Sequence, residues 1–197
     1  MGATQLNGRH IVLGVTGSIA AYKAAEVARR LQDEGAVVRV AMTESATQFI
    51  TPLTFETLTG QPVYAGMFSE RAWVIEHITW ARWADLILVA PATANTLAHL
   101  AQGMADNPVT SLCLAREPRV PLLIVPAMNT MMWQAPSTQR NVGLLMNDGA
   151  RFVEPGSGVM ACREVGPGRL AEPLEIVEAV SATLATHCDL DLSLIHI

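Results

Sequence analysis

Two segments of the chain combine residue types that can do chemistry. The first contains Asn129, which follows a short apolar run, Leu122–Val125, that predicts a buried strand. An amide at the carboxyl end of a strand lies where ligands bind in doubly wound folds. The second, 156–169, is rich in glycine and carries Cys162 near its middle; it predicts a mobile flap, too flexible to pack. Together they indicate a site that holds a small polar substrate and acts on it.

The composition of the chain argues against several classes of function. The 197 residues, half of them apolar, predict one domain with a full core. A net charge of −5 and thirteen basic residues that form no run argue against binding to nucleic acid or to an anionic membrane. The three cysteines are far apart and show no metal-ligand spacing, so no metal site is predicted. Without a signal peptide or a spanning apolar stretch, we expect a cytoplasmic protein.

Strand and helix patterns alternate along the chain. His10–Val15 predicts a strand, Ile19–Glu34 a helix that Gly35 ends, and Val37–Met42 a second strand. Further strands are expected at 85–90, 121–125 and 151–153, with helices between them and a last helix from Leu174 to about Thr186. We therefore predict a single-domain α/β fold, a three-layer Rossmann-like (flavodoxin-like) doubly wound parallel sheet. The domain would span 9–186, with 1–8 as a loose leader and 187–197 as a tail, either a linker or an artificial extension.

Small polar residues follow three of the predicted strands, at 14–18, 43–45 and 91–96. Their repetition at one sheet edge favours a mononucleotide-type ligand. The first turn lacks the spacing of a dinucleotide site or a P-loop, so its glycine and hydroxyls suit one phosphate. A simple helix cap by Ser18 is the alternative at this turn.

Five features in order resemble one family, the homo-oligomeric flavin-containing cysteine decarboxylases, over about residues 9–186. The resemblance is strongest to members that act on 4′-phosphopantothenoylcysteine, usually as the N-terminal half of a bifunctional coenzyme A biosynthesis protein. It implies FMN as cofactor, a homotrimer that can assemble further to a dodecamer, and flavin held near a subunit interface. The features are Gly17–Lys23, His77, Pro91–Thr96, Pro126–Asn129 and the Cys162 segment ending in Gly166–Arg169.

The resemblance also implies roles for single residues. Asn129 would grip the substrate carboxylate, His77 would act as base, and Cys162 would be the acid that protonates the reduced intermediate. The expected FMN contacts are Gly17, Ser18, Ile19, Thr43, Ser45, Thr93, Ala94, Asn95, Thr96 and Ala127.

The implied reaction is an FMN-dependent decarboxylation to 4′-phosphopantetheine. Oxidation at the carbon bearing sulfur gives a thioaldehyde that serves as electron sink for CO₂ loss, and the resulting ene-thiol is reduced again. An imidazole suits the base role at neutral pH. A peptidyl-cysteine decarboxylase would stop at the ene-thiol, and Cys162 argues against it. A flavin prenyltransferase would leave His77, Asn129 and Cys162 unexplained, and a non-catalytic flavoprotein regulatory subunit typically carries acidic extensions.

Two departures from the family pattern bear on these expectations. Arg163 follows the cysteine where glycine is common, so it could restrict the flap or contact the substrate phosphate. Nothing after residue 186 resembles the synthetase half, so we do not expect this chain to ligate cysteine.

The remaining histidines, Cys113 and the tryptophans are expected to have structural rather than catalytic roles. His10, His99, His187 and His196 match no motif and are expected to be structural or exposed, and Cys113 to be buried. The tryptophans Trp73, Trp80 and Trp83 fit a core, a flavin surround or an interface, of which we favour the interface.

Overall fold

The computed structural model describes the chain at residues 6–66, 76–159 and 165–194. Cys162, Arg163 and Trp73, named above, therefore lie outside the described residues. Within the described part, no helix has both the length and the apolar character needed to cross a bilayer.

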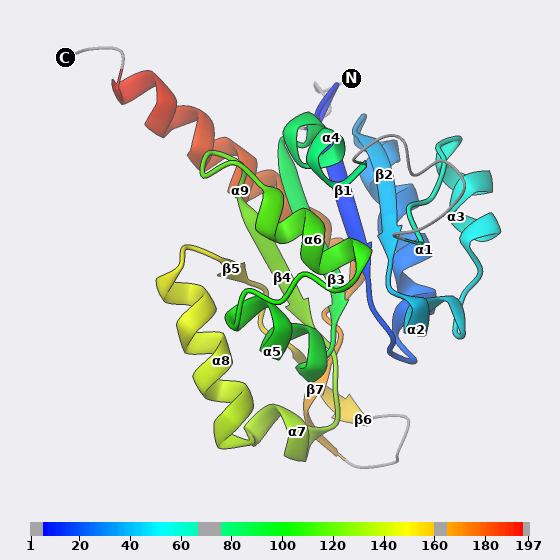
Figure 1. The fold of residues 1–197 in the computed structure, drawn as a ribbon, viewed down its shortest axis with the longest axis vertical. Helices are drawn as coiled ribbons and strands as arrows, with labels where there is room; N and C mark the ends of the chain where they lie inside the picture. The colour runs from blue at the N-terminus through cyan, green and yellow to red at the C-terminus, as the bar shows by residue number, and fades with distance from the viewer. Residues whose placement is uncertain (1–5, 67–75, 160–164, 195–197) are drawn as a thin grey trace.

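A five-stranded parallel sheet forms the centre of the molecule (Figure 1). Its strand order, β2-β1-β3-β4-β5, confirms the predicted doubly wound, flavodoxin-like α/β fold. The order reverses between β1 and β3, so a crevice is expected beyond the carboxyl ends of these two strands. The strands are β1 (His10–Val15), β2 (Val37–Met42), β3 (Leu86–Ala92), β4 (Leu122–Pro126) and β5 (Arg151–Phe152).

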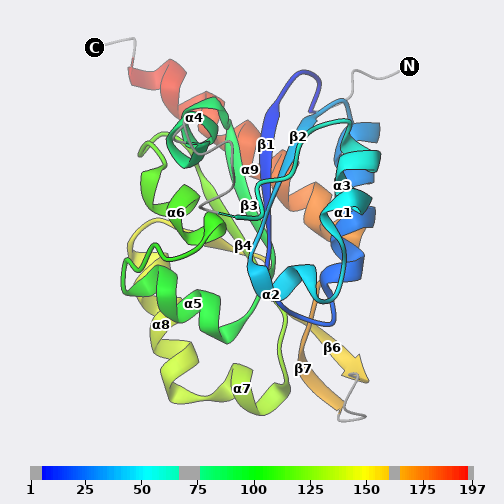
Figure 2. The same ribbon diagram turned by 45° about the vertical axis from the view of Figure 1, so that its right-hand side comes forward.

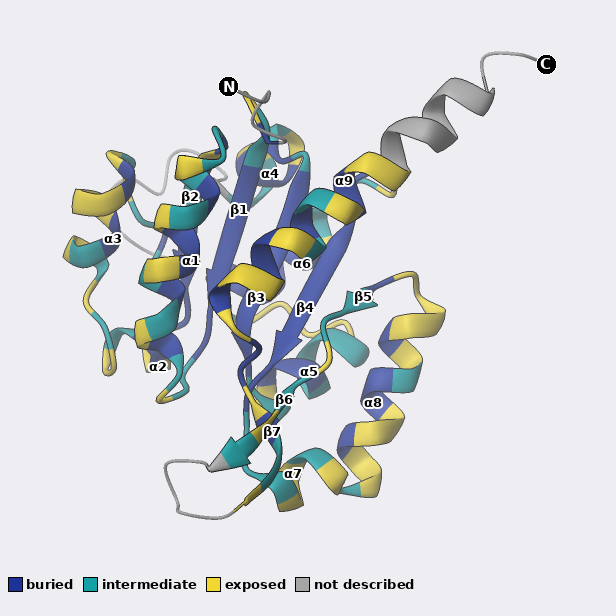
Figure 3. Ribbon diagram, turned by 180° about the vertical axis from the view of Figure 1, so that it is seen from behind, coloured by how far each residue is buried: buried dark blue, intermediate teal, exposed yellow. Residues whose placement is uncertain are grey.

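Helices cover both faces of the sheet and make the three predicted layers (Figures 1 and 2). One face carries α1 and α9, and the other carries α4, α5, α6 and α8 (Figures 1 and 3). The central strands are buried between these layers (Figure 3), with β3 buried along its whole length. The helices are α1 (Ala21–Asp33), α2 (Glu44–Thr47), α3 (Pro52–Thr59), α4 (Glu76–Trp83), α5 (Ala94–Ala101), α6 (Pro108–Ala115), α7 (Thr130–Gln134), α8 (Pro136–Asn147) and α9 (Pro173–Leu194).

Helix α1 shows how the sequence produces this packing. Its buried residues, among them Ala24, Val27 and Leu31, recur at helical spacing and face the core. Gly35 follows the helix with φ +88°, a left-handed conformation that glycine adopts without strain. The alternative of a helix cap by Ser18 does not hold, because Ala20 is the residue at the N-cap position of α1. The Ser18 Oγ instead accepts a hydrogen bond from the Ala20 N–H, so the helix begins later than expected.

The described residues nearest the two ends, 6–8 and 187–194, include a buried side chain and part of a helix. Leu6, in the expected leader, is fully buried, and its N–H donates to the Glu34 carbonyl at 3.3 Å. Helix α9 continues past the expected end at Thr186 to Leu194. No glycine or proline interrupts residues 187–194, so the sequence contains no helix-breaking residue there.

The expected flexible flap is largely a β-hairpin. Its strands β6 (Gly156–Val159) and β7 (Val165–Arg169) pair antiparallel, with Gly158 opposite Gly166. The prediction that this segment is too flexible to pack was wrong for β7, whose contacts belong to the site described next.

Candidate functional site

Thr16 ties together the two loops that follow β1 and β3. Its side chain is buried, and its hydroxyl donates to the Pro91 carbonyl at 2.7 Å. The same oxygen accepts a hydrogen bond from the Thr93 N–H at 3.2 Å. Sequence reasoning missed this role, because the partners lie far away in the chain and no local pattern marks them. The loops after β1 and β3 consequently form one unit.

Gly17 lies directly against the first turn of α2. A Cβ atom built on Gly17 would be 2.4 Å from the Cβ of Ser45, so only glycine fits without a shift of the backbone. Thr43 caps α2 by accepting from the Ala46 N–H at 3.2 Å, and its own N–H donates to the Val15 carbonyl. The structure thereby brings the predicted residues after β1 and β2 together.

Residues 16–19 after β1 and 43–45 after β2 form what we call the cradle, and its surface is open. Ile19 is 60% exposed, an unusual state for a large apolar side chain, and Ser45 is exposed as well. The Ser18 N–H donates to the Thr16 carbonyl, which shapes the turn from within. Exposed apolar surface beside small polar groups suits an amphipathic ligand or a second protein surface.

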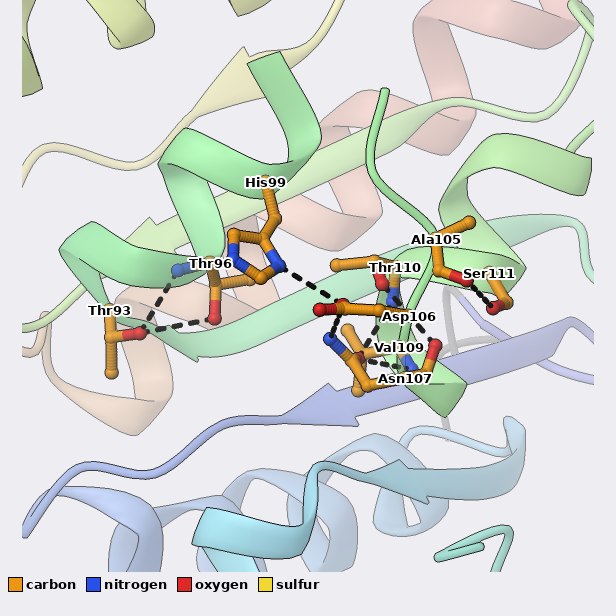
Figure 4. A network of polar contacts seen from close by, with 9 residues as sticks. All are labelled: Thr93, Thr96, His99, Ala105, Asp106, Asn107, Val109, Thr110 and Ser111. Carbon is orange, nitrogen blue, oxygen red and sulfur yellow. Dashed lines mark hydrogen bonds and ion pairs between the residues drawn. The ribbon is translucent and has the colours of Figure 1, made fainter. Parts of the chain in front are cut away.

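The start of α5 supplies the next part of the site (Figure 4). Thr93 accepts from the Thr96 N–H at 3.2 Å, and the two hydroxyl oxygens are 3.1 Å apart. Thr96 is buried, Ala94 is half-buried and Asn95 is exposed. The hydroxyl of Thr93 is therefore engaged as a helix cap, and Asn95 faces solvent beside it.

Behind this turn, His99 and Asp106 hold the loop between α5 and α6 (Figure 4). The His99 Nδ1 lies 3.0 Å from Asp106 Oδ1, and the Asn107 amide donates to the same oxygen. The hydrogen bond from His99 is the main cause that lowers the pKa of Asp106. Asn107 also caps α6 through its Oδ1, as the sequence predicts. His99 is thus structural in this chain, as expected.

Asn129 lies at the carboxyl end of β4, next to the loop after β3. The neighbouring Ala127 donates its N–H to the Ala92 carbonyl at 3.0 Å, which joins the two strand ends. Asn129 is half-buried, and its Oδ1 accepts from the Met131 N–H at 2.7 Å. This cap of α7 determines the orientation of the amide side chain.

The β6–β7 hairpin packs onto the Asn129 segment through its glycines. The Met128 N–H donates to the Gly168 carbonyl at 2.9 Å. A Cβ on Gly168 would lie 2.3 Å from the Met128 carbonyl oxygen, and one on Gly166 would lie 2.6 Å from Thr130 Oγ1. These glycines therefore permit close packing. They place the two strands that flank the Cys162 segment at the carboxyl end of the sheet (Figures 1 and 3).

An ion-pair cluster links the hairpin to α1. Glu172 lies 3.0 Å from the Arg169 guanidinium at the end of β7 and 3.2 Å from the Lys23 ammonium. Lys23 belongs to the predicted Gly17–Lys23 motif, so the cluster joins two of the predicted features.

His77 stands apart from these residues in the single chain. Its helix, α4, lies at the amino end of the sheet, opposite α5, α7 and the hairpin (Figures 1 and 2). The Trp83 ring stacks on His10, the first residue of β1, with centroids 4.3 Å apart. The Asp85 N–H also donates to the His10 carbonyl. One chain thus brings together the predicted residues after β1, β2, β3 and β4, but not His77.

Two other features do not contribute to this site. A hollow of about 410 Å³ lies between α5, α6 and α8, and its lining contains none of the predicted site residues. Cys113 lines it; burial raises the pKa of this thiol to about 12, so it stays protonated at neutral pH. No cluster of three or more His, Cys, Asp or Glu residues suited to a metal occurs among the described residues.

Comparison with known proteins decides the family. The flavoprotein family matches residues 2–185. The chain belongs to this flavoprotein family. A Streptococcus mutans protein named "Probable phosphopantothenoylcysteine decarboxylase" is 49% identical over 177 residues, 89% of this chain and 99% of the relative. The coenzyme A biosynthesis bifunctional protein CoaBC of Escherichia coli (strain K12) is 46% identical over 186 residues, 94% of this chain. The chain spans 45% of that relative's length.

Solved structures of flavoprotein decarboxylases share the fold. A cysteine-to-serine variant of PPC decarboxylase in complex with pantothenoylaminoethenethiol is 30% identical with a TM-score of 0.79, covering 90% of this chain and 98% of that one. The FMN-dependent cysteine decarboxylase SpaF is 33% identical with a TM-score of 0.80, covering 93% and 99%. The predicted resemblance to flavin-containing cysteine decarboxylases is thereby confirmed.

Proposed function

We propose that this flavoprotein binds FMN and decarboxylates 4′-phosphopantothenoylcysteine to 4′-phosphopantetheine, a step of coenzyme A biosynthesis, with residues 9–186 as the catalytic unit. The observation that carries the proposal is the convergence of three loops, after β1, β3 and β4, at the carboxyl edge of the sheet. Thr16 and Ala127 join these loops by hydrogen bonds. The relatives named for this activity add independent support.

The residues present fit FMN. Gly17 packs so closely against α2 that a Cβ would collide with Ser45, and this close approach brings the exposed Ser45 next to the glycine turn. Glycine backbone and hydroxyl groups suit a phosphate monoester, the end of FMN that needs polar contacts. The remaining proposed contacts are Ser18, Ile19, Thr43, Thr93, Ala94, Asn95, Thr96 and Ala127.

Bound FMN would supply the oxidation and the later reduction at the substrate carbon that bears sulfur. The chain's own residues bind and move protons. Asn129, oriented by its cap on α7, would donate its amide N–H to the substrate carboxylate. Cys162 would deliver a proton to the ene-thiol left after CO₂ departs, from a segment whose flanking strands are held next to Asn129.

His77 would reach the reacting group from a neighbouring copy of the chain. Its helix, α4, lies at the amino end of the sheet (Figures 1 and 2), whereas Asn129 follows the carboxyl end of β4, so we propose that a neighbouring copy supplies His77. This separation supports a homotrimer in which flavin lies near the subunit interface. Ile19 and Tyr22, beside the cradle, are 60% and 62% exposed. Large apolar side chains this exposed fit such an interface.

Product analysis tests the enzymatic proposal. The purified chain is mixed with 4′-phosphopantothenoylcysteine, and its products are compared by mass with those of Cys162→Ser. We expect phosphopantetheine from the parent and a species two hydrogens lighter from the variant. A parent that releases only the lighter species would contradict the role of Cys162 and favour the chemistry of a peptidyl-cysteine decarboxylase. A purified chain without flavin absorbance that also fails to bind added FMN would contradict the cofactor.

Mixed assemblies test the shared site. His77→Asn and Asn129→Asp variants are each expected to be nearly inactive alone. When the two are dissociated and reassembled together, some sites receive both native residues, so activity should return. No recovery in assemblies shown by mass spectrometry to contain both variants would contradict a shared site. Light scattering of the parent should give the mass of a trimer or a multiple of it.

We also propose a cytoplasmic location, since nothing in the cysteine spacing indicates disulfides. Cell fractionation with an antibody to the chain tests this, and recovery in a membrane fraction would contradict it.

A further inference from the structure

We propose that Arg39 is a positioning residue for His77, acting through Trp80 and Trp83 of α4. The inference rests on the proposed function for its catalytic meaning, but the contacts that carry it are independent of that function.

Arg39 holds two aromatic rings of α4 at once. It lies on β2, and its guanidinium carbon is 4.2 Å from the centroid of the Trp83 ring and 5.4 Å from that of Trp80. The Trp83 ring also stacks on the His10 ring of β1, with an angle of 15° between the two ring planes. Tyr64 meets Trp80 edge-on at 5.8 Å. The two tryptophans thus connect α4 to β1, to β2 and to the segment beside β2.

Among the described residues, the contacts of the Arg39 cation are with the two aromatic rings. The Arg39 Nε is buried and has no hydrogen-bond partner among the described residues. Desolvation by burial lowers the pKa of the guanidinium, which shows that the protein environment opposes the charge. An apolar side chain would avoid this cost. The attraction of the cation to the faces of two tryptophan rings is the compensating interaction that the structure offers.

The spacing on α4 links this anchor to the catalytic base. Trp80 lies three residues from both His77 and Trp83, so its side chain is a neighbour of each of them on the helix surface. Trp80 is buried, at 6% exposure. Because both rings meet the same guanidinium, Arg39 restricts the rotation of α4 about its axis and its distance from β2. A rotation of the helix would displace His77 by a similar angle, and small displacements of a catalytic group cost large factors in rate.

Three variants separate positioning from general stability. Arg39→Met removes the cation and keeps an apolar side chain of similar length. Arg39→Lys keeps a charge over the rings, so it should restore part of the lost function. Arg29→Met is the matched control: Arg29 is an exposed residue of α1 that forms an ion pair with Asp33, on the face of the sheet opposite α4.

The kinetic readout is the rate of flavin reduction by saturating substrate, normalised to bound flavin. We expect R39M to lower this rate about tenfold, with KM nearly unchanged because Asn129 and the cradle are untouched. R39K should lie between R39M and the parent, and R29M should match the parent. The double variant H77N/R39M should be no slower than H77N alone, since Arg39 acts through His77. Additive losses in the double variant would overturn the proposal.

Amide hydrogen exchange provides a readout that needs no activity. R39M should speed exchange across Glu76–Trp83 and leave α7 unchanged, whereas R29M should change neither. Unchanged exchange in α4 of R39M would overturn the proposal even if its rate fell. Should the parent fail to turn over the substrate, the proposed function fails, and exchange still decides whether Arg39 holds α4. If R39M does not fold, Arg39→Gln takes its place, with the same expected and contradicting results.

Discussion

Replacing Thr16 by valine tests the hydrogen bonds that join the loops after β1 and β3. Valine has nearly the same shape as threonine but cannot donate or accept a hydrogen bond. The Pro91 carbonyl would lose a donor now at 2.7 Å, and the Thr93 N–H would lose an acceptor at 3.2 Å. Thr16 is only 1% exposed, so water cannot readily replace the hydroxyl.

The expected loss of stability follows from these two contacts. A buried backbone group left without a partner costs roughly 1–3 kcal/mol, and Thr93 is partly exposed, so we expect a total of about 2–4 kcal/mol. In a chain of this size, 1 kcal/mol corresponds to about 2–4 °C in Tm, so Thr16→Val should unfold about 5–15 °C below the parent. FMN retention should fall as well, because the valine frees the two loops from each other.

Thermal unfolding of the flavin-free protein, followed by circular dichroism, measures this effect. FMN must be absent or saturating in all samples, because a bound ligand raises Tm by mass action. Thr16→Ser is the matched control, since it keeps the hydroxyl and removes one methyl group. Equal Tm values for the valine and serine variants would refute the reasoning, because the hydroxyl would then contribute nothing.

The remaining predictions concern the cradle, the buried thiol and the α5–α6 loop. Gly17→Ala should purify with little flavin but a folded circular dichroism spectrum, because its Cβ would lie 2.4 Å from that of Ser45; Gly143→Ala, with nothing within 4 Å, should retain its flavin. Cys113, whose pKa burial raises to about 12, is neutral below that value and should react with iodoacetamide only after unfolding, as peptide mass mapping would detect. The pKa of Asp106 is lowered by the hydrogen bond from His99, so its contribution to stability is present above the ordinary carboxyl range and is lost as the pH falls through the folded value. Asp106→Asn should therefore flatten part of the acid side of the stability profile, and identical profiles for the two proteins would argue against this pair.

Much of the fold follows from local sequence. The apolar runs of β1 and β2 begin and end where predicted, because most of their residues are apolar and buried in the sheet. Asn107 before Pro108 predicted the start of α6 correctly, since both residues act on the first turn alone. Asn129 was also placed correctly at a strand end, because that expectation needed only the run before it.

The contacts that complete the site could not be predicted in this way. Thr16 looks like any small polar residue until β3 lies beside β1 and brings Pro91 to its hydroxyl. The glycines of β7 suggested flexibility, whereas they permit contact with a segment that only the tertiary fold brings near. In the sequence, Arg39 is one basic residue in a predicted strand. Its contact with the Trp80 and Trp83 rings of α4 is visible only in the folded chain.

The separation of His77 from Asn129 is likewise a property of topology. Sequence order places His77 between two groups of site residues, which gives no sign that its helix lies at the other end of the sheet (Figure 1). The motif around His77 indicates that the residue belongs to the family pattern. It does not indicate whether His77 acts in its own chain or in a neighbouring copy.

The most direct test of the account is the reaction of the purified, flavin-loaded chain with 4′-phosphopantothenoylcysteine, followed by mass spectrometry of the small molecules. The account predicts loss of one CO₂ and accumulation of 4′-phosphopantetheine in amounts that exceed the enzyme. Unchanged substrate, under conditions where FMN is bound and the chain is folded, would contradict the proposed reaction.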